Sequence, residues 1–222
     1  MLNPDLFLDT FVALFAVLNP LLAVSVFLSL TAEESPGERQ RVAAIASITT
    51  AAALCVAALI GDRILSLFGV QVPAFQVAGG IILLTIALGM LKSGFAPENT
   101  EQQIASGPAR PPRHIAVYPL AIPLIAGPGS FVTTIVMSSR VSSSGDFLAL
   151  SAGIVANALV LWLSLVFAVQ FARIVGQTVV SIGTPLLAIL LAAIAVELVF
   201  TGIDTHVLRL VSVLERWSNR DA

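Results

Sequence analysis

Long apolar runs separated by short polar stretches dominate the chain. Taking about 20 apolar residues as one membrane crossing, these runs predict six transmembrane helices, at residues 6–30, 42–60, 74–92, 115–139, 147–171 and 184–203. The longest polar interruption, residues 96–114, is rich in proline and polar side chains and is typical of a flexible linker. The pattern therefore predicts an all-α membrane protein made of two three-helix repeats, residues 1–95 and 115–203, followed by an amphipathic polar tail, residues 204–222.

The composition agrees with a membrane protein and narrows its chemistry. Hydrophobic residues make up 57% of the 222 residues and charged residues only 11%, whereas a soluble domain carries about 25% charged residues. The net charge of −2 comes without any basic stripe, so we expect no nucleic-acid partner. A single cysteine, Cys55, excludes an internal disulfide, and no histidine or cysteine motif predicts a metal or another cofactor.

The basic residues predict an orientation. Lysine and arginine favour the cytoplasmic side of short connections, and most of those near the predicted helices lie in the first, third and fifth connections. This places both termini outside, although three arginines of the tail would then also lie outside. The residues compared are Arg39, Arg41, Lys92, Arg110, Arg113 and Arg173, against Arg63 and Arg140.

Prolines interrupt the fourth predicted helix. Pro119, Pro123 and Pro128 lie within residues 115–139, and Gly127 and Gly129 flank the last of them. Proline removes a main-chain donor and clashes with the preceding turn, so an unbroken helix is not expected. We predict two half-helices, the second beginning at Pro128, and such irregular main chain at membrane depth is tolerated only where it is buried in protein or lines a cavity.

A second break and an internal repeat follow from one shift of the sequence on itself. A displacement of 108 residues aligns Asn19-Pro20 in the first helix with Gly127-Pro128 in the fourth. The same displacement aligns residues 80–94 with 188–202, with five identities at Ile81, Leu83, Ile86, Ala87 and Gly94. Because each half has three crossings, the halves would have inverted topology, a plan found in secondary transporters.

The two predicted breaks suggest a binding site for an anionic group. Asn19 is expected to cap a half-helix that begins at Pro20, and two half-helix N-termini would then face the middle of the membrane. Each would offer unpaired N–H groups and a partial positive charge, which suit a carboxylate. The alternative is that these prolines only kink packed helices. The candidate residues are Asn19, Pro20, Ser25, Gly127, Pro128, Gly129, Ser130 and Thr133.

Two further polar residues lie inside predicted helices. Glu197 should face the protein interior or a wet cavity, where it would receive an ammonium group or a coupling proton; alternatively it reaches the membrane surface from near the end of its helix. Asn157 would either hydrogen-bond a broken helix or contact substrate. Gly79-Gly80 is expected to permit close approach of two helices.

Three runs together resemble the MarC family of bacterial and archaeal integral membrane proteins. They are LNPLLAVSVFLSLT at the first break, AFQVAGGIILLTIALGML in the third helix, and IAVYPLAIPLIAGPGSFVTTIV in the fourth. The resemblance implies a multi-pass protein of the cytoplasmic (inner) membrane, related to transporters of small neutral amino acids and similar to LysE-type exporters. It also implies that Asn19-Pro20 and Gly127 to Ser130 are the family's two proline breaks.

The resulting hypothesis is a secondary transporter, an exporter or exchanger, of small neutral amino acids such as glycine or alanine. A proton or a sodium ion would couple the transport. One rival is a non-transporting MarC protein with a stress-related or scaffold role. A second rival, a membrane enzyme, is disfavoured because no intramembrane histidine or lysine accompanies the serines as a base.

Overall fold

The computed structural model describes residues 3–92, 115–170 and 185–205. The predicted linker and all but the first two residues of the predicted tail lie outside this part of the chain. Every element in the described residues is a helix. The elements are α1 (Pro4–Leu18), α2 (Pro20–Leu30), α3 (Pro36–Leu67), α4 (Val72–Lys92), η1 (Ala116–Ile125), α7 (Pro128–Ser138), α8 (Ser144–Val166) and the helix Pro185–Thr205.

Five stretches among the described residues are long and apolar enough to cross a bilayer: Pro4–Leu30, Pro36–Leu67, Val72–Leu91, Ser144–Val166 and Pro185–Thr205. They coincide with five of the six predicted crossings. The fourth predicted crossing is not among them because it is divided into η1, with 10 residues, and α7, with 11 residues. Each piece is too short to cross alone, since a crossing needs about 20 residues.

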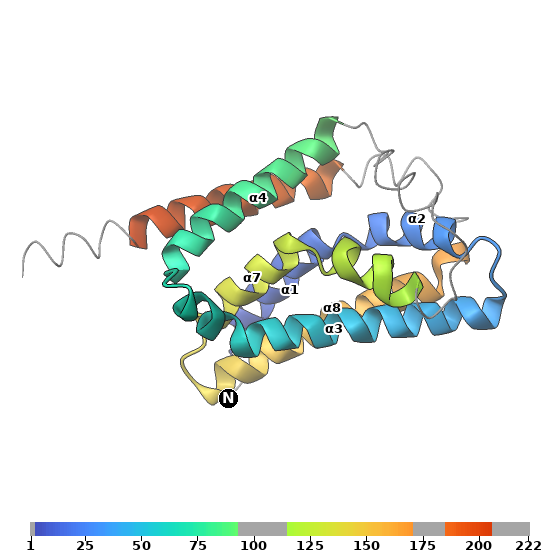
Figure 1. The fold of residues 1–222 in the computed structure, drawn as a ribbon, viewed down its shortest axis with the longest axis horizontal. Coiled ribbons are helices and arrows are strands. Elements are labelled where there is room, and N and C mark those ends of the chain that lie inside the picture. The colour runs from blue at the N-terminus through green and yellow to red at the C-terminus, as the bar shows by residue number, and fades with distance from the viewer. Residues whose placement is uncertain (1–2, 93–114, 171–184, 206–222) are drawn as a thin grey trace, which may run out of the picture.

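Successive segments alternate in direction along the long axis of the molecule (Figure 1). The chain runs along α1 and α2, returns along α3, and runs forward again along α4. It then returns along η1 and α7, runs forward along α8, and returns along the helix Pro185–Thr205. The segment η1 followed by α7 therefore runs opposite to α1 followed by α2.

Six of these segments pack into one bundle, formed by α1, α2, α3, η1, α7 and α8. In this bundle α8 contacts α1 and α2, α3 contacts η1 and α7, and α3 and α8 contact each other. Leu14, Phe27, Leu54, Leu120 and Leu161 are among its fully buried side chains. The contacts are reciprocal, because the helix that follows each broken segment packs against the broken segment of the other half.

The remaining two helices, α4 and Pro185–Thr205, form a helix pair beside the bundle (Figure 1). Glycine allows the pair to approach closely, as the sequence predicted: a β-carbon at Gly80 would lie 2.6 Å from the carbonyl oxygen of Ala195. A second hydrophobic core joins this helix pair to α7 of the bundle. Its buried residues are Leu83, Ala87, Val132, Val136, Leu191, Ala195 and Leu198.

Polar contacts at one end of the bundle fix the start of α8 against the N-terminus. Ser143 and Asp146 form a reciprocal capping box at the first turn of α8. Asn3 caps α1 through Leu6 N–H and also donates a hydrogen bond of 2.8 Å to the Asp146 carboxylate. These bonds fix the position of α1 along the bundle axis relative to α8. They therefore also fix the position along that axis at which the chain breaks at Asn19.

We expect Gly80→Ala to destabilise the helix pair by about 1–3 kcal/mol, because the added methyl group meets a carbonyl oxygen that cannot rotate away. Gly89→Ala is the matched control on the same helix, since a β-carbon there meets no atom within 4 Å. Thermal unfolding of the purified protein in detergent measures both. Equal unfolding midpoints for the two variants would contradict the close approach at Gly80.

Candidate functional site

The first break lies between α1 and α2 at Asn19. Asn19 has a left-handed conformation, with φ 43° and ψ 75°, which asparagine tolerates better than most residues. Its Oδ1 accepts a hydrogen bond of 3.3 Å from Leu22 N–H and so caps α2. Pro20 follows as the first residue of α2, where its missing N–H costs nothing. The break and its cap agree with the sequence prediction.

The second break separates η1 from α7. Within η1, Tyr118 and Ile122 have extended conformations, with φ near −130°. Each precedes a proline, and a proline ring disfavours the helical conformation of the residue before it. Gly127 is extended and provides no side-chain cap, and Pro128 begins α7 as predicted.

Ser130 satisfies the main chain at the second break. Its hydroxyl donates to the carbonyl oxygens of Ile125 and Gly127, at 2.9 Å and 3.2 Å. An unpaired carbonyl in an apolar environment costs about 1–3 kcal/mol. The Ser130 hydroxyl therefore stabilises the interruption of the helix.

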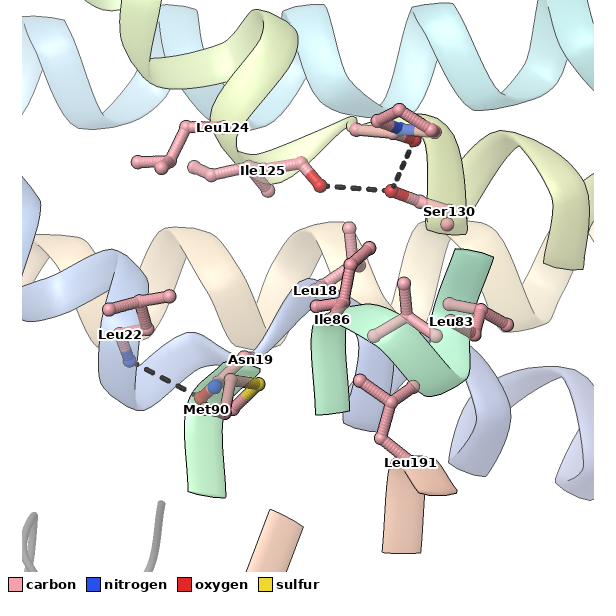
Figure 2. Close-up of a pocket in the computed structure, with 14 residues that line it drawn as sticks. Leu18, Asn19, Leu22, Leu83, Ile86, Met90, Leu124, Ile125, Ser130 and Leu191 are labelled. Atoms are coloured by element: carbon pink, nitrogen blue, oxygen red, sulfur yellow. Dashed lines mark hydrogen bonds between the residues drawn. The ribbon is translucent and has the colours of Figure 1, made fainter. Parts of the chain in front are cut away.

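A cavity of about 250 Å³ lies where the two breaks meet (Figure 2). Asn19 contributes from the first break, and Gly127, Pro128, Gly129 and Ser130 contribute from the second. The other residues that line it are aliphatic or methionine. They are Val17, Leu18, Leu22, Leu83, Ile86, Met90, Leu124, Ile125 and Leu191.

The cavity has few polar groups, and they are not fully paired. Asn19 is only 3% exposed, and its Nδ2 has no hydrogen-bond partner. At the start of α7, Phe131 N–H bonds to Gly127 O, so Gly129 and Ser130 supply the N–H groups at the uncapped end of the helix. On the other side, Val17 and Leu18 bring the C-terminal end of α1 to the cavity. None of the lining residues that the structure describes is charged.

The cavity is lined by pairs of residues that the internal repeat aligns. At the separation of Pro20 and Pro128, 108 residues, Val17 matches Ile125, Asn19 matches Gly127, Leu22 matches Ser130 and Leu83 matches Leu191. Both members of all four pairs line the cavity. The two halves of the sequence therefore contribute corresponding positions to one site.

Three predicted site residues near the breaks lie outside the lining. Pro20 is buried at the start of α2. Ser25 donates to the carbonyl of Leu21 within its own helix, at 3.2 Å. Thr133 is 1% exposed and its hydroxyl has no partner, but it lies one turn beyond Ser130 on α7.

The other two predicted residues are farther from the breaks. Asn157 Nδ2 donates to the carbonyl oxygens of Phe11 and Gly153, at 3.1 Å and 2.9 Å, and so joins α8 to α1. Glu197 is exposed on the helix Pro185–Thr205. Neither residue lines the cavity.

The residues that the helix pair contributes to the cavity were not predicted from the sequence. They are Leu83, Ile86 and Met90 of α4, which Figure 2 shows beside the two breaks, and Leu191 of the helix Pro185–Thr205. Leu83 approaches the second break closely, because a β-carbon at Gly129 would lie 2.5 Å from Leu83 Cδ2. One signal for this contribution was present in the sequence: the residues at positions 83 and 191, which are 108 residues apart, are both leucine.

Comparison with known proteins places the chain among integral membrane proteins. Residues 5–207 match the family described as MarC family integral membrane protein. The UPF0056 membrane protein YhcE of Escherichia coli is 34% identical over 193 residues, which cover 87% of this chain and 89% of that protein. A UPF0056 membrane protein of Methanocaldococcus jannaschii is 35% identical over 197 residues, covering 89% and 95%. The Bacillus subtilis protein YvbG is 31% identical over 193 residues, covering 87% and 92%.

No solved structure matches the chain. The family match nonetheless covers both broken segments, the helix pair and the bundle. It agrees with the resemblance that the proline breaks and the third helix suggested. The chain belongs to the MarC family of integral membrane proteins.

Proposed function

We propose that this protein is a secondary transporter of small neutral amino acids such as glycine or alanine. The observation that carries the proposal is the cavity between the two helix breaks, into which the buried and unpartnered amide of Asn19 contributes. A buried polar group without a partner is costly, so such a group at a cavity points to a ligand. The cavity of about 250 Å³ is smaller than the roughly 300–1,000 Å³ of sites for drug-sized ligands.

The carboxylate of the substrate would lie at the start of α7. The N–H groups of Gly129 and Ser130 lie at the N-terminus of α7, which has no side-chain cap. The helix dipole adds a partial positive charge there. The Asn19 amide would donate from the other break. The start of α2 is a weaker candidate, because the Asn19 side chain already caps it through Leu22 N–H.

The ammonium group would lie at the C-terminal end of α1. The last carbonyl groups of a helix lack intrahelical donors, and they carry the negative end of the helix dipole. Val17 and Leu18 bring this end of α1 to the cavity, and Pro20 has no N–H to offer to the preceding turn. Glu197 is exposed and outside the lining, so the main-chain carbonyls are the better acceptors.

A net-neutral substrate is favoured because the described residues that line the cavity include no charged side chain. A lysine or glutamate substrate would bring a further charge with no counter-ion, and burial of an unpaired charge is strongly unfavourable. A zwitterion instead meets helix ends of opposite sign.

Transport would proceed by movement of the helix pair against the bundle. The reciprocal contacts of the two halves and the paired cavity residues support inverted repeats of six crossings, with the substrate site at the repeat interface. The presence of two hydrophobic cores supports a division into two moving bodies, the bundle and the helix pair, with α7 packed between them. The proposal places the protein in the cytoplasmic membrane with both termini outside, and a proton or sodium ion would drive transport.

Counterflow in proteoliposomes tests transport whichever ion is coupled to it. Vesicles loaded with unlabelled alanine should accumulate external labelled alanine and glycine transiently, at rates well above those of protein-free vesicles. Pro128→Ala, which removes the residue that opens α7, should reduce the rate at least tenfold. Folded protein that exchanges no neutral amino acid across a broad panel would refute transport and favour a scaffold role.

Asn19→Asp should weaken alanine binding at least tenfold. Aspartate tolerates the left-handed conformation and keeps an oxygen to cap α2, but it replaces the amide donor with an acidic group that repels a carboxylate. Equilibrium binding of labelled alanine measures the effect, and thermal unfolding checks that the cap is retained. Alaninamide, which lacks the carboxylate, should bind weakly to both proteins; unchanged alanine binding in the variant would contradict the assigned role of the amide.

A disulfide between α4 and α7 should stop counterflow while alanine still binds. A β-carbon at Gly79 would lie 3.0 Å from Val132 Cβ, slightly closer than the roughly 3.5–4.5 Å of a disulfide, so Gly79→Cys with Val132→Cys should cross-link. Cys55→Ala provides a background without other cysteines. Reduction should restore exchange, and each single-cysteine variant should be insensitive to oxidation. Full exchange by the cross-linked protein would show that α4 does not move against α7.

A further inference from the structure

We propose that the cavity selects its substrates by an aliphatic side chain, with Ile86 bounding the space for that side chain. The inference rests on the proposed amino-acid site and narrows its substrate class. It differs from the expectation of glycine or alanine, which followed from the resemblance to transporters of small neutral amino acids.

The first step is the chemistry of the walls. Nine of the fourteen lining residues in the described part of the chain are valine, leucine, isoleucine or methionine. Among them Ser130 carries the one hydroxyl, and its proton is directed to the carbonyl oxygens of Ile125 and Gly127. With the Asn19 amide and the uncapped N–H groups of α7 assigned to the carboxylate, a hydroxyl on the substrate side chain would find fewer hydrogen-bond partners here than in water.

The second step is size. A cavity of about 250 Å³ equals roughly eight water volumes of about 30 Å³ each. Glycine would leave part of this apolar cavity unfilled and would forgo contacts with its walls, which an aliphatic side chain would make.

The third step is the direction of the side chain. The polar groups come from the two breaks, while Leu83, Ile86 and Met90 of α4, together with Leu191, form the wall that the helix pair supplies (Figure 2). Leu83 and Leu191 are fully buried, at 0% and 1% exposure, and belong to the second hydrophobic core. Ile86 is 39% exposed, so it can be shortened with little loss of core packing, and it is the lining residue best suited to test the limit.

Isosteric pairs of amino acids test the selection. Competition against labelled alanine on the intact protein should show valine binding about ten- to a hundredfold more tightly than threonine, and alanine more tightly than serine or glycine. Threonine equal to valine, or glycine as the tightest ligand, would overturn this inference and leave amino-acid transport standing. If none of these amino acids binds, the proposed function falls as well.

Ile86→Ala tests the boundary. Removing these carbons should raise the affinity for leucine relative to alanine about tenfold. Ile82→Ala is the matched control, because Ile82 lies one turn earlier on α4, is 41% exposed and does not line the cavity. The affinity of this variant for leucine relative to alanine should equal that of the unmodified protein. An unchanged ratio in Ile86→Ala, with thermal unfolding showing a folded protein, would refute the role of Ile86. The same shift in both variants would refute it too, because it would then arise from α4 as a whole.

Discussion

Main-chain hydrogen bonding inside a membrane is the constraint on which this structure depends. Lipid offers no substitute for a missing partner, so a broken helix survives only where protein groups replace the lost bonds. At the first break the Asn19 side chain caps α2, and the Asn19 N–H still reaches Phe15 O at 3.2 Å. At the second break the Ser130 hydroxyl covers two carbonyl groups. Among the groups left without such a replacement, the Asn19 amide donor, the first N–H groups of α7 and the last carbonyl groups of α1 lie at one cavity.

The packing keeps both breaks away from lipid. Asn19 is 3% exposed and Ser130 1% exposed, because α3 and α8 pack against the two broken segments and the helix pair packs against α7. Gly129 makes the contact between α7 and α4 possible, because a β-carbon there would lie 2.5 Å from Leu83 Cδ2 of α4. Thus α4 covers one side of the cavity by close packing on α7, and a small displacement of the helix pair would change access to the cavity.

The sequence predicted the features that single residue types determine. Asn19-Pro20 and Gly127-Pro128 specify their breaks locally, because proline constrains its neighbours and asparagine tolerates a left-handed conformation. Five apolar runs likewise predicted their helices. The aliphatic cavity wall was missed because Leu83 and Ile86 resemble the lipid-facing leucines and isoleucines around them, and only three-dimensional packing distinguishes them. From sequence alone, Asn157 could either hydrogen-bond a broken helix or contact substrate. In the structure its Nδ2 donates to Phe11 O of α1 and to Gly153 O of its own helix, so it links α8 to α1.

Residues of the two breaks that are 108 positions apart in the sequence differ in chemistry at the site. Asn19 corresponds to Gly127, and Leu22 corresponds to Ser130, so the first break carries a capping amide and the second carries a hydroxyl turned toward its own carbonyl groups. A perfectly symmetric site would hold a zwitterion equally well in two opposed directions. Here α2 is capped and α7 is not, so the carboxylate of a bound zwitterion would have one preferred end and its side chain one preferred wall. Duplication would thus supply the symmetric frame for two access states, while the side-chain differences between the breaks and the α4 wall would supply the specificity.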